Sequence, residues 1–300
     1  MSGALLAASG GCLPDAAFDI STLQAAVLGI TQGLTEFLPI SSSGHLIVVP
    51  WAFGWDEIYC AEAGNKFFDI ALHIGTFVGA ALYLRRDLSR LIRAFFASLS
   101  ARSVTTQDQR MAWYLVLATI PAALIGAVLE GPITEHLGKP WQIAILLAIF
   151  GVLLYVVDTR VVQETPYDGM TRNQALGMGV AQALALAPGV SRSGATITAA
   201  RAMGVTRDAA ARFSFLLSLP ITLGAALYSA VTLGDTGGLD GQGTQFAVGI
   251  VFSGISGALA VWGVLRIIRT RSYGDFALYR VVAAAAILIA IATGVRPGSF

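Results

Sequence analysis

Six long apolar runs bounded by charged residues constrain this chain more than any other feature of its sequence. They cover roughly residues 67–84, 111–129, 141–157, 213–233, 246–268 and 278–295. A helix needs about 20 apolar residues to cross a bilayer, and a membrane barrel would instead show strict alternation. Only 12% of the residues are charged, against about 25% in soluble domains. The sequence therefore predicts an all-α polytopic membrane protein.

Charge and cysteine content exclude other classes. The net charge is +1 and no Lys/Arg-rich patch is long enough to follow a phosphate backbone, so no nucleic-acid partner is expected. Cys12 and Cys60 are too few for a disulfide scaffold. Both fall on the predicted outer side, where a disulfide is permitted. Residues 1–22 lack the features of a signal peptide and are predicted as an N-terminal extension, before a single membrane domain at 23–300.

Basic residues predict the orientation of the spans, because cytoplasmic loops carry an excess of Lys and Arg. Of the 19 Lys and Arg, 15 fall on one alternating set of connections and three on the other. The larger set includes Arg201 before the fourth span, and Arg266 and Arg280 between the fifth and sixth. The arginine-rich connections are therefore predicted to face the cytoplasm, and both termini to face outward.

Two further apolar stretches, residues 23–55 and 173–203, are interrupted in their middle. The first contains PISSSGH at 39–45 and the second contains PGVSRSG at 188–194. A helix loses backbone hydrogen bonds at such sequences, and in a membrane the freed groups need partners inside the protein or in a water-filled cavity. Each stretch is therefore predicted to be a re-entrant helical hairpin.

The two halves of the chain also resemble each other. Ser41, Ser43 and Gly44 recur 150 residues later as Ser191, Ser193 and Gly194, and GAALY occurs at both 79–83 and 224–228. The predicted fold is two inverted-topology repeats, about 23–157 and 173–295. Each repeat comprises one re-entrant hairpin and three transmembrane helices. In such folds the site lies where the broken segments meet.

Ionisable residues inside a membrane are costly and are therefore functional candidates. This chain has five in its apolar segments: Glu36, His45, Asp69, His73 and Arg192. Gln32 lies four residues before Glu36 on one helix face, and their oxygens suit a hard divalent cation. Arg192 carries donors suited to a phosphate, and His45 can act as nucleophile or acid–base. This set suits phosphoryl transfer, which depends on positioning and charge neutralisation.

Structural roles are the alternative for each residue. Glu36 and Arg192 could pair only to hold the hairpins together, His45 could cap a broken helix, and serines commonly bond a helix backbone. Asp69 and His73 could line the cavity or form a local pair. A string of small residues permits close helix packing, within the chain or between two protomers of a homodimer: Gly249, Ser253, Gly254, Ser256 and Gly257.

The segments QGLTEFLPISSSGH at 32–45 and PGVSRSGAT at 188–196 resemble the undecaprenyl-pyrophosphate phosphatase family, the bacitracin-resistance-type membrane phosphatases. The resemblance extends from about Leu23 to Val295. It implies hydrolysis of undecaprenyl diphosphate to the monophosphate, which recycles the carrier lipid for peptidoglycan synthesis and confers bacitracin resistance. It also implies the inner membrane of a bacterium, a divalent cation (Mg²⁺ or Ca²⁺) and an active site open to the periplasmic side.

The resemblance implies residue roles at the matching positions. The catalytic residues are Glu36, His45, Ser42 and Arg192, with His45 and Ser42 as alternative nucleophiles. Glu36 and Gln32 hold the metal, although the family often has Glu where Gln32 stands. The substrate-binding residues are Arg192, Ser191, Ser193, Thr196, Ser41 and Ser43. A transporter or flippase of the carrier lipid is the alternative function, because inverted repeats with re-entrant hairpins are also a transporter architecture. A non-catalytic scaffold would have no need of buried charge.

Overall fold

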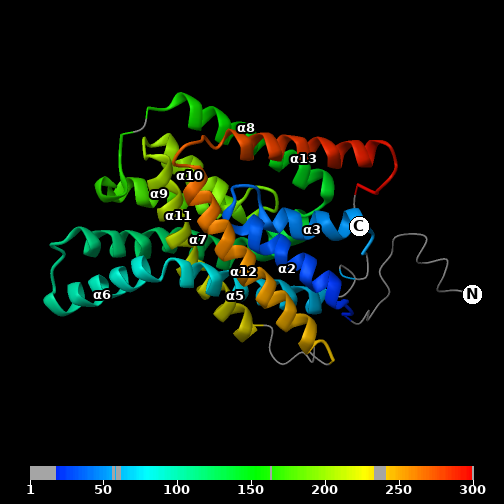
Figure 1. The fold of residues 1–300 in the computed structure, drawn as a ribbon, viewed down its shortest axis with the longest axis horizontal. Helices are drawn as coiled ribbons and strands as arrows, with labels where there is room; N and C mark the ends of the chain where they lie inside the picture. Colours follow the sequence, from blue (N-terminus) through cyan, green and yellow to red (C-terminus); the bar gives the residue numbers. More distant parts are fainter. Residues whose placement is uncertain (1–17, 56–57, 59–61, 163, 233–240, 299–300) are drawn as a thin grey trace, which may run out of the picture.

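The computed structural model describes residues 18–55, 58, 62–162, 164–232 and 241–298. Over these residues the chain is all-helical, as its sequence predicts (Figure 1). Cys12 and Cys60 lie outside the described residues, as does most of the predicted N-terminal extension. The helices are α2 (Thr22–Phe37), α3 (Ser42–Phe53), α5 (Glu62–Tyr83), α6 (Arg85–Ala101), α7 (Gln107–His136), α8 (Pro140–Arg160), η1 (Tyr167–Gly169), α9 (Arg172–Ala183), η2 (Leu184–Leu186), α10 (Arg192–Ala202), α11 (Arg207–Thr232), α12 (Gly243–Ile267) and α13 (Gly274–Ala292).

Each of the six predicted apolar runs lies in a helix over its described residues, apart from the last one to three residues of the runs 67–84, 246–268 and 278–295. Five of these helices, α7, α8, α11, α12 and α13, are long and apolar enough to cross a membrane. The remaining run, 67–84, lies in α5, which is followed by α6 after a bend of 85°. Helix α6 was not predicted as a separate element. It is amphipathic, with arginines on one side and exposed Ile92, Phe96 and Leu99 on another.

Of the 15 arginines assigned to connections, 12 lie in helices instead, and three of these fall inside the predicted apolar stretches. Arg201 is in α10, Arg266 in α12 and Arg280 in α13. Arg201 and Arg280 are fully buried. The sequence prediction was wrong here because it counted these three arginines as connection residues, although they fall within the predicted apolar stretches 173–203, 246–268 and 278–295. A helix can extend through a buried arginine when other elements supply the hydrogen-bond acceptors.

The helices pack in groups that bring distant segments together. Helix α12 packs against α2 and α5, and α13 lies along α8 (Figure 1). The predicted string of small residues allows the first of these contacts. A Cβ at Gly79 of α5 would lie 2.1 Å from the backbone oxygen of Gly254, and a Cβ at Gly33 of α2 would lie 2.5 Å from that of Ser253. The string therefore packs within the chain, and a homodimer stays a prediction.

The two predicted interruptions are present and share one local geometry. Ser41 and Ser191 have φ angles of 77° and 75°, the left-handed region that most residues avoid. Each caps the helix that follows, and its hydroxyl accepts the N–H of Gly44 or Gly194. The same serine-capped restart thus occurs twice, 150 residues apart. That the hairpins are re-entrant, and that the repeats are inverted, stays a prediction.

Candidate active site

Glu36, a buried carboxylate near the end of α2, binds the first residue of a helix from each broken segment. Its Oε1 lies 2.6 Å from Nη2 of Arg192, which begins α10. Its Oε2 accepts a hydrogen bond of 2.5 Å from the hydroxyl of Ser42, which begins α3. Nε2 of Gln32 donates to the same oxygen at 3.0 Å, as the predicted shared helix face requires. Hydrogen bonds to an ionised group are about twice as strong as neutral ones. The structure therefore joins four predicted site residues into one polar cluster.

His73 and Thr222 lie at the edge of this cluster. Nε2 of His73 is 3.7 Å from Oε2 of Glu36, and Nδ1 bonds the backbone oxygen of Asp69 at 2.8 Å. Thr222, on α11, accepts from Nη1 of Arg192 at 3.5 Å. His73 thus lies beside Glu36, and its Nδ1 bonds the backbone of Asp69.

The other hydroxyl groups predicted to bind substrate form hydrogen bonds with neighbouring residues of the protein. Ser41 accepts the N–H of Gly189 at 3.0 Å, and Ser193 donates to the carbonyl of Leu38 at 2.9 Å. These two bonds tie the first break to the second. The other hydroxyls also have partners within their own segments or on α11: Ser43, Ser191 and Thr196. Contact between these hydroxyls and a phosphate stays a prediction.

His45 lies one helix turn beyond Ser41 and faces α13. Its Nδ1 is 2.7 Å from the backbone oxygen of Ser41. A carbonyl oxygen only accepts, so Nδ1 carries the proton. Its Nε2 is 2.8 Å from the hydroxyl of Tyr279, and the two rings are stacked with centroids 5.7 Å apart. Among the described residues, no hydrogen bond joins His45 to Glu36 or Arg192.

Arg280 is the main site residue that the sequence analysis missed. Its Nη1 donates to the oxygen of Pro39 in the first break at 3.1 Å. Its Nη2 donates to the oxygens of Gly189 and Val190 in the second break, at 2.9 and 3.0 Å. Its Nε donates to the oxygen of Leu147 on α8 at 3.1 Å. One buried guanidinium therefore satisfies backbone carbonyls of both broken segments. The sequence could have identified Arg280 as a candidate, because it is an ionisable residue within the predicted span 278–295.

The donor set partly fits a divalent cation. Oε1 of Gln32 is buried and has no hydrogen-bond partner in the described part of the chain. It lies on the same side chain as the amide nitrogen bound to Glu36, so an amide oxygen and a carboxylate are available nearby. No group of three or more His, Cys, Asp or Glu residues suited to a metal occurs among the described residues. Such an ion would therefore take most of its ligands from elsewhere.

The fold and the site define an all-helical membrane protein in which two broken helices bring a carboxylate, a guanidinium and a hydroxyl together. A family model described as bacitracin resistance protein BacA matches residues 25–286. The chain belongs to this family.

Curated relatives match nearly the whole chain, and each is named undecaprenyl-diphosphatase. The relative from Pelobacter propionicus is 42% identical over 277 residues, covering 92% of this chain and 99% of the relative. The relative from Geobacter sulfurreducens is 45% identical over 267 residues, covering 89% and 97%. The relative from Nocardioides sp. is 40% identical over 277 residues, covering 92% and 98%.

Proposed function

We propose that this protein hydrolyses undecaprenyl diphosphate to undecaprenyl phosphate and inorganic phosphate. This reaction recycles the carrier lipid for cell-wall synthesis and confers bacitracin resistance. One observation carries the proposal: Glu36 is held by Arg192 and Ser42, the first residues of α10 and α3. Helix N-termini, guanidinium groups and hydroxyls are the donors that bind phosphates. The names of the relatives supply the lipid substrate.

Ser42 is the nucleophile in this proposal. Its hydroxyl already donates to Glu36, and this is the arrangement of a nucleophile beside its base. The Ser42 oxygen attacks the terminal phosphorus, Glu36 takes the proton, and undecaprenyl phosphate leaves. Arg192 transfers from Glu36 to the phosphate oxygens. After Glu36 has passed its proton to solvent, it activates the water that releases phosphate from Ser42.

His45 is the less favoured nucleophile. Its Nδ1 bears the proton, and its Nε2, the nitrogen that would attack, is directed at the hydroxyl of Tyr279. Attack by His45 would first require Tyr279 to move. The Ser42 hydroxyl needs no such rearrangement.

A Mg²⁺ or Ca²⁺ ion is the proposed cofactor. Glu36 and the free oxygen of Gln32 would hold it, with diphosphate oxygens as further ligands. When bound, the ion would neutralise negative charge on the diphosphate. Position 32 is Gln and supplies no second carboxylate. We therefore expect the substrate to provide part of the metal site.

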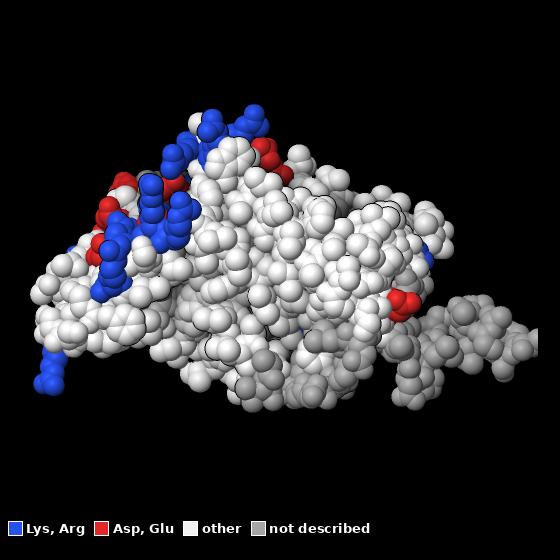
Figure 2. Space-filling model, turned by 60° about the horizontal axis from the view of Figure 1, so that its bottom comes forward, with Lys and Arg blue, Asp and Glu red and all other residues white. Residues whose placement is uncertain are grey.

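The protein is proposed to be a multi-pass protein of the bacterial inner membrane, with its active site open to the periplasmic side. Figure 2 supports this, because Lys and Arg gather toward one end and a broad uncharged surface adjoins them. An excess of basic residues is typical of the cytoplasmic side. Labelling at Arg102→Cys, in a Cys12→Ser/Cys60→Ser background, tests the orientation. An impermeant thiol reagent should reach this position only after the inner membrane is opened.

Phosphate release from undecaprenyl diphosphate in detergent tests the function. The wild type should release phosphate, and EDTA and Glu36→Gln should each abolish release. Glu164→Gln is the matched control, because Glu164 is an exposed carboxylate in the loop after α8. In Ser42→Ala the rate should fall by at least about 10³-fold. No release from folded, metal-supplied wild type would refute the proposal.

A trapping experiment separates the two nucleophiles. Rapid quenching with radiolabelled substrate should leave label on Ser42, as an acid-stable phosphoserine. Acid-labile label that persists in Ser42→Ala would instead identify His45. That result would overturn the assignment of Ser42 without affecting the phosphatase assignment.

A further inference from the structure

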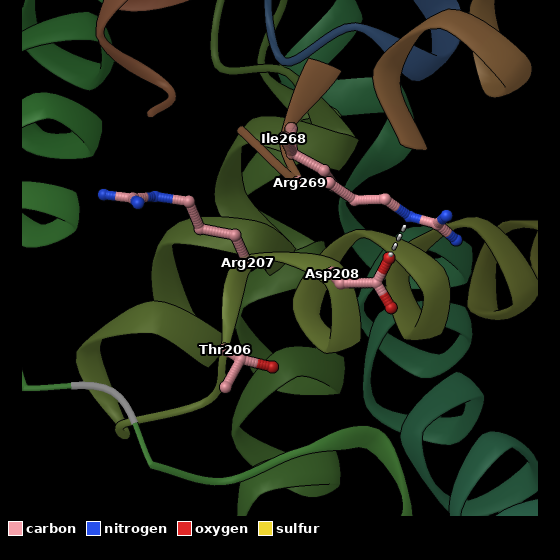
Figure 3. A pocket seen from close by; sticks show the side chains of 5 residues that line it. All are labelled: Thr206, Arg207, Asp208, Ile268 and Arg269. Atoms are coloured by element: carbon pink, nitrogen blue, oxygen red, sulfur yellow. Dashed lines mark ion pairs between the residues drawn. The ribbon is translucent and has the colours of Figure 1, made fainter. Parts of the chain in front are cut away.

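Two adjoining cavities lie where α5 bends into α6 and where α11 begins. The first has a volume of about 430 Å³ and is lined by Thr206, Arg207, Asp208, Ile268 and Arg269 (Figure 3). The second, of about 350 Å³, adds Arg86 and Arg212. Both include Asp208 and Arg269, so the two cavities adjoin each other, and together they are here named the arginine groove. It involves none of the residues of the candidate active site.

Three of the four arginines in the groove pair with acids, and two of these pairs are close. Nε of Arg207 is 3.0 Å from Asp158, and Nη2 of Arg212 is 2.5 Å from Asp87. These pairs fix the walls of the groove.

The other two arginines, Arg86 and Arg269, are exposed and keep donors available to a ligand. Arg86 is exposed and makes no ion pair with any residue that the structure describes. Arg269 has a side chain that is 72% exposed, and its Nε is 3.5 Å from Asp208, a long contact marked by the dashed line in Figure 3. Asp87 and Asp208 oppose an anion, but the four guanidiniums of the groove outnumber these two carboxylates. The groove therefore presents excess positive charge.

The surroundings of the groove are amphiphilic. Tyr83 and Leu265 line it beside the arginines. Helix α6, which starts at the bend, exposes Ile92, Phe96 and Leu99 at the spacing of one helix face. An amphipathic helix with arginines on its polar side is typical of a helix that lies in a membrane interface. A ligand of the groove would thus find apolar surface next to guanidinium groups.

We propose that the arginine groove binds the phosphate of an anionic phospholipid headgroup, with Arg86 and Arg269 as its ligands. Basic pockets between membrane helices on the cytoplasmic side bind such headgroups. Guanidinium forks match phosphate oxygens, and the apolar lining accepts the start of the acyl chains. A zwitterionic headgroup is disfavoured, because its cation would lie among arginines. The proposal does not depend on the phosphatase activity.

Native mass spectrometry of the detergent-solubilised protein tests this site. The protein is titrated with dioleoyl phosphatidylglycerol and, separately, with dioleoyl phosphatidylcholine. The wild type should bind the first lipid more tightly. In Arg86→Gln/Arg269→Gln this affinity should fall about 30-fold, as two arginines at about 1 kcal/mol each imply. Binding of phosphatidylcholine should not change.

The control is Arg93→Gln/Arg102→Gln, which removes the same charge from exposed positions of α6 and its cap, outside the groove. An equal loss in this control would show diffuse surface attraction and overturn the proposal. Inorganic phosphate that displaces phosphatidylglycerol at micromolar concentration would identify free phosphate as the ligand and overturn the lipid assignment. If the double variant misfolds, Arg86→Gln alone, at an exposed position, is titrated in its place. Glu36→Gln should keep the lipid preference, so failure of this proposal is distinct from failure of the phosphatase proposal.

Discussion

Arg280→Lys tests whether α13 builds the active site by holding both broken segments. In the wild type the guanidinium bonds Pro39 on one side, Gly189 on another and Leu147 on α8. A lysine keeps the charge but has its three donors on one nitrogen, so it cannot reach carbonyls in several directions. If two buried acceptors lose their partners, at about 1–3 kcal/mol each, the free energy of unfolding falls by about 2–6 kcal/mol.

This loss corresponds to a fall in Tm of about 4–12 °C, at roughly 2 °C per kcal/mol for a chain of this size. Tryptophan fluorescence of the protein in detergent measures Tm. Phosphate release at a temperature below both transitions measures activity, and kcat should fall at least about tenfold, since misplacing catalytic groups by about 1 Å can cost 10²-fold. Arg271→Lys, at an exposed side chain paired with Asp275, should change neither quantity. Wild-type Tm and kcat in Arg280→Lys would refute the reasoning.

Three further substitutions test separate contacts. Tyr279→Phe removes the hydrogen bond to Nε2 of His45, worth about 1 kcal/mol, and should leave kcat/KM unchanged in the phosphate-release assay, because Ser42 and not His45 attacks the phosphorus. A change of about fivefold, the equivalent of that hydrogen bond, would show that His45 takes part in the reaction. Gly79→Ala places a Cβ against the backbone of α12 and should lower the free energy of unfolding by about 1–3 kcal/mol. The control is Gly224→Ala in the second GAALY segment, whose Cβ would meet nothing within 4 Å and should leave stability unchanged. Equal melting curves for the two variants would contradict this prediction. Asp158→Asn weakens the ion pair with fully buried Arg201 and should lower the free energy of unfolding by up to about 3–5 kcal/mol. The loss of monodisperse protein on heating measures this change, with Asp275→Asn at an exposed position as the control. A variant as stable as the wild type would show that the ion pair is dispensable.

The sequence alone determined the class of fold and the centre of the site. Long apolar runs predict membrane helices because the bilayer sets their length. Pro and Gly inside the two remaining apolar stretches predict breaks, because Pro removes a backbone hydrogen bond and Gly disfavours the helix. Glu36 and Arg192 stood out because an ionised group inside a membrane is costly unless it is used.

Only the tertiary structure decided how those residues meet. Glu36 and Arg192 are 156 positions apart, and His45 and Tyr279 are 234 apart, so no local pattern links either pair. The structure makes Ser42 a direct partner of Glu36 and directs His45 toward α13. It also places Arg280 between the two breaks, although its position among basic residues indicated a loop. A local sequence shows which backbone carbonyls a break leaves without partners, whereas the packing of distant helices determines which side chain satisfies them.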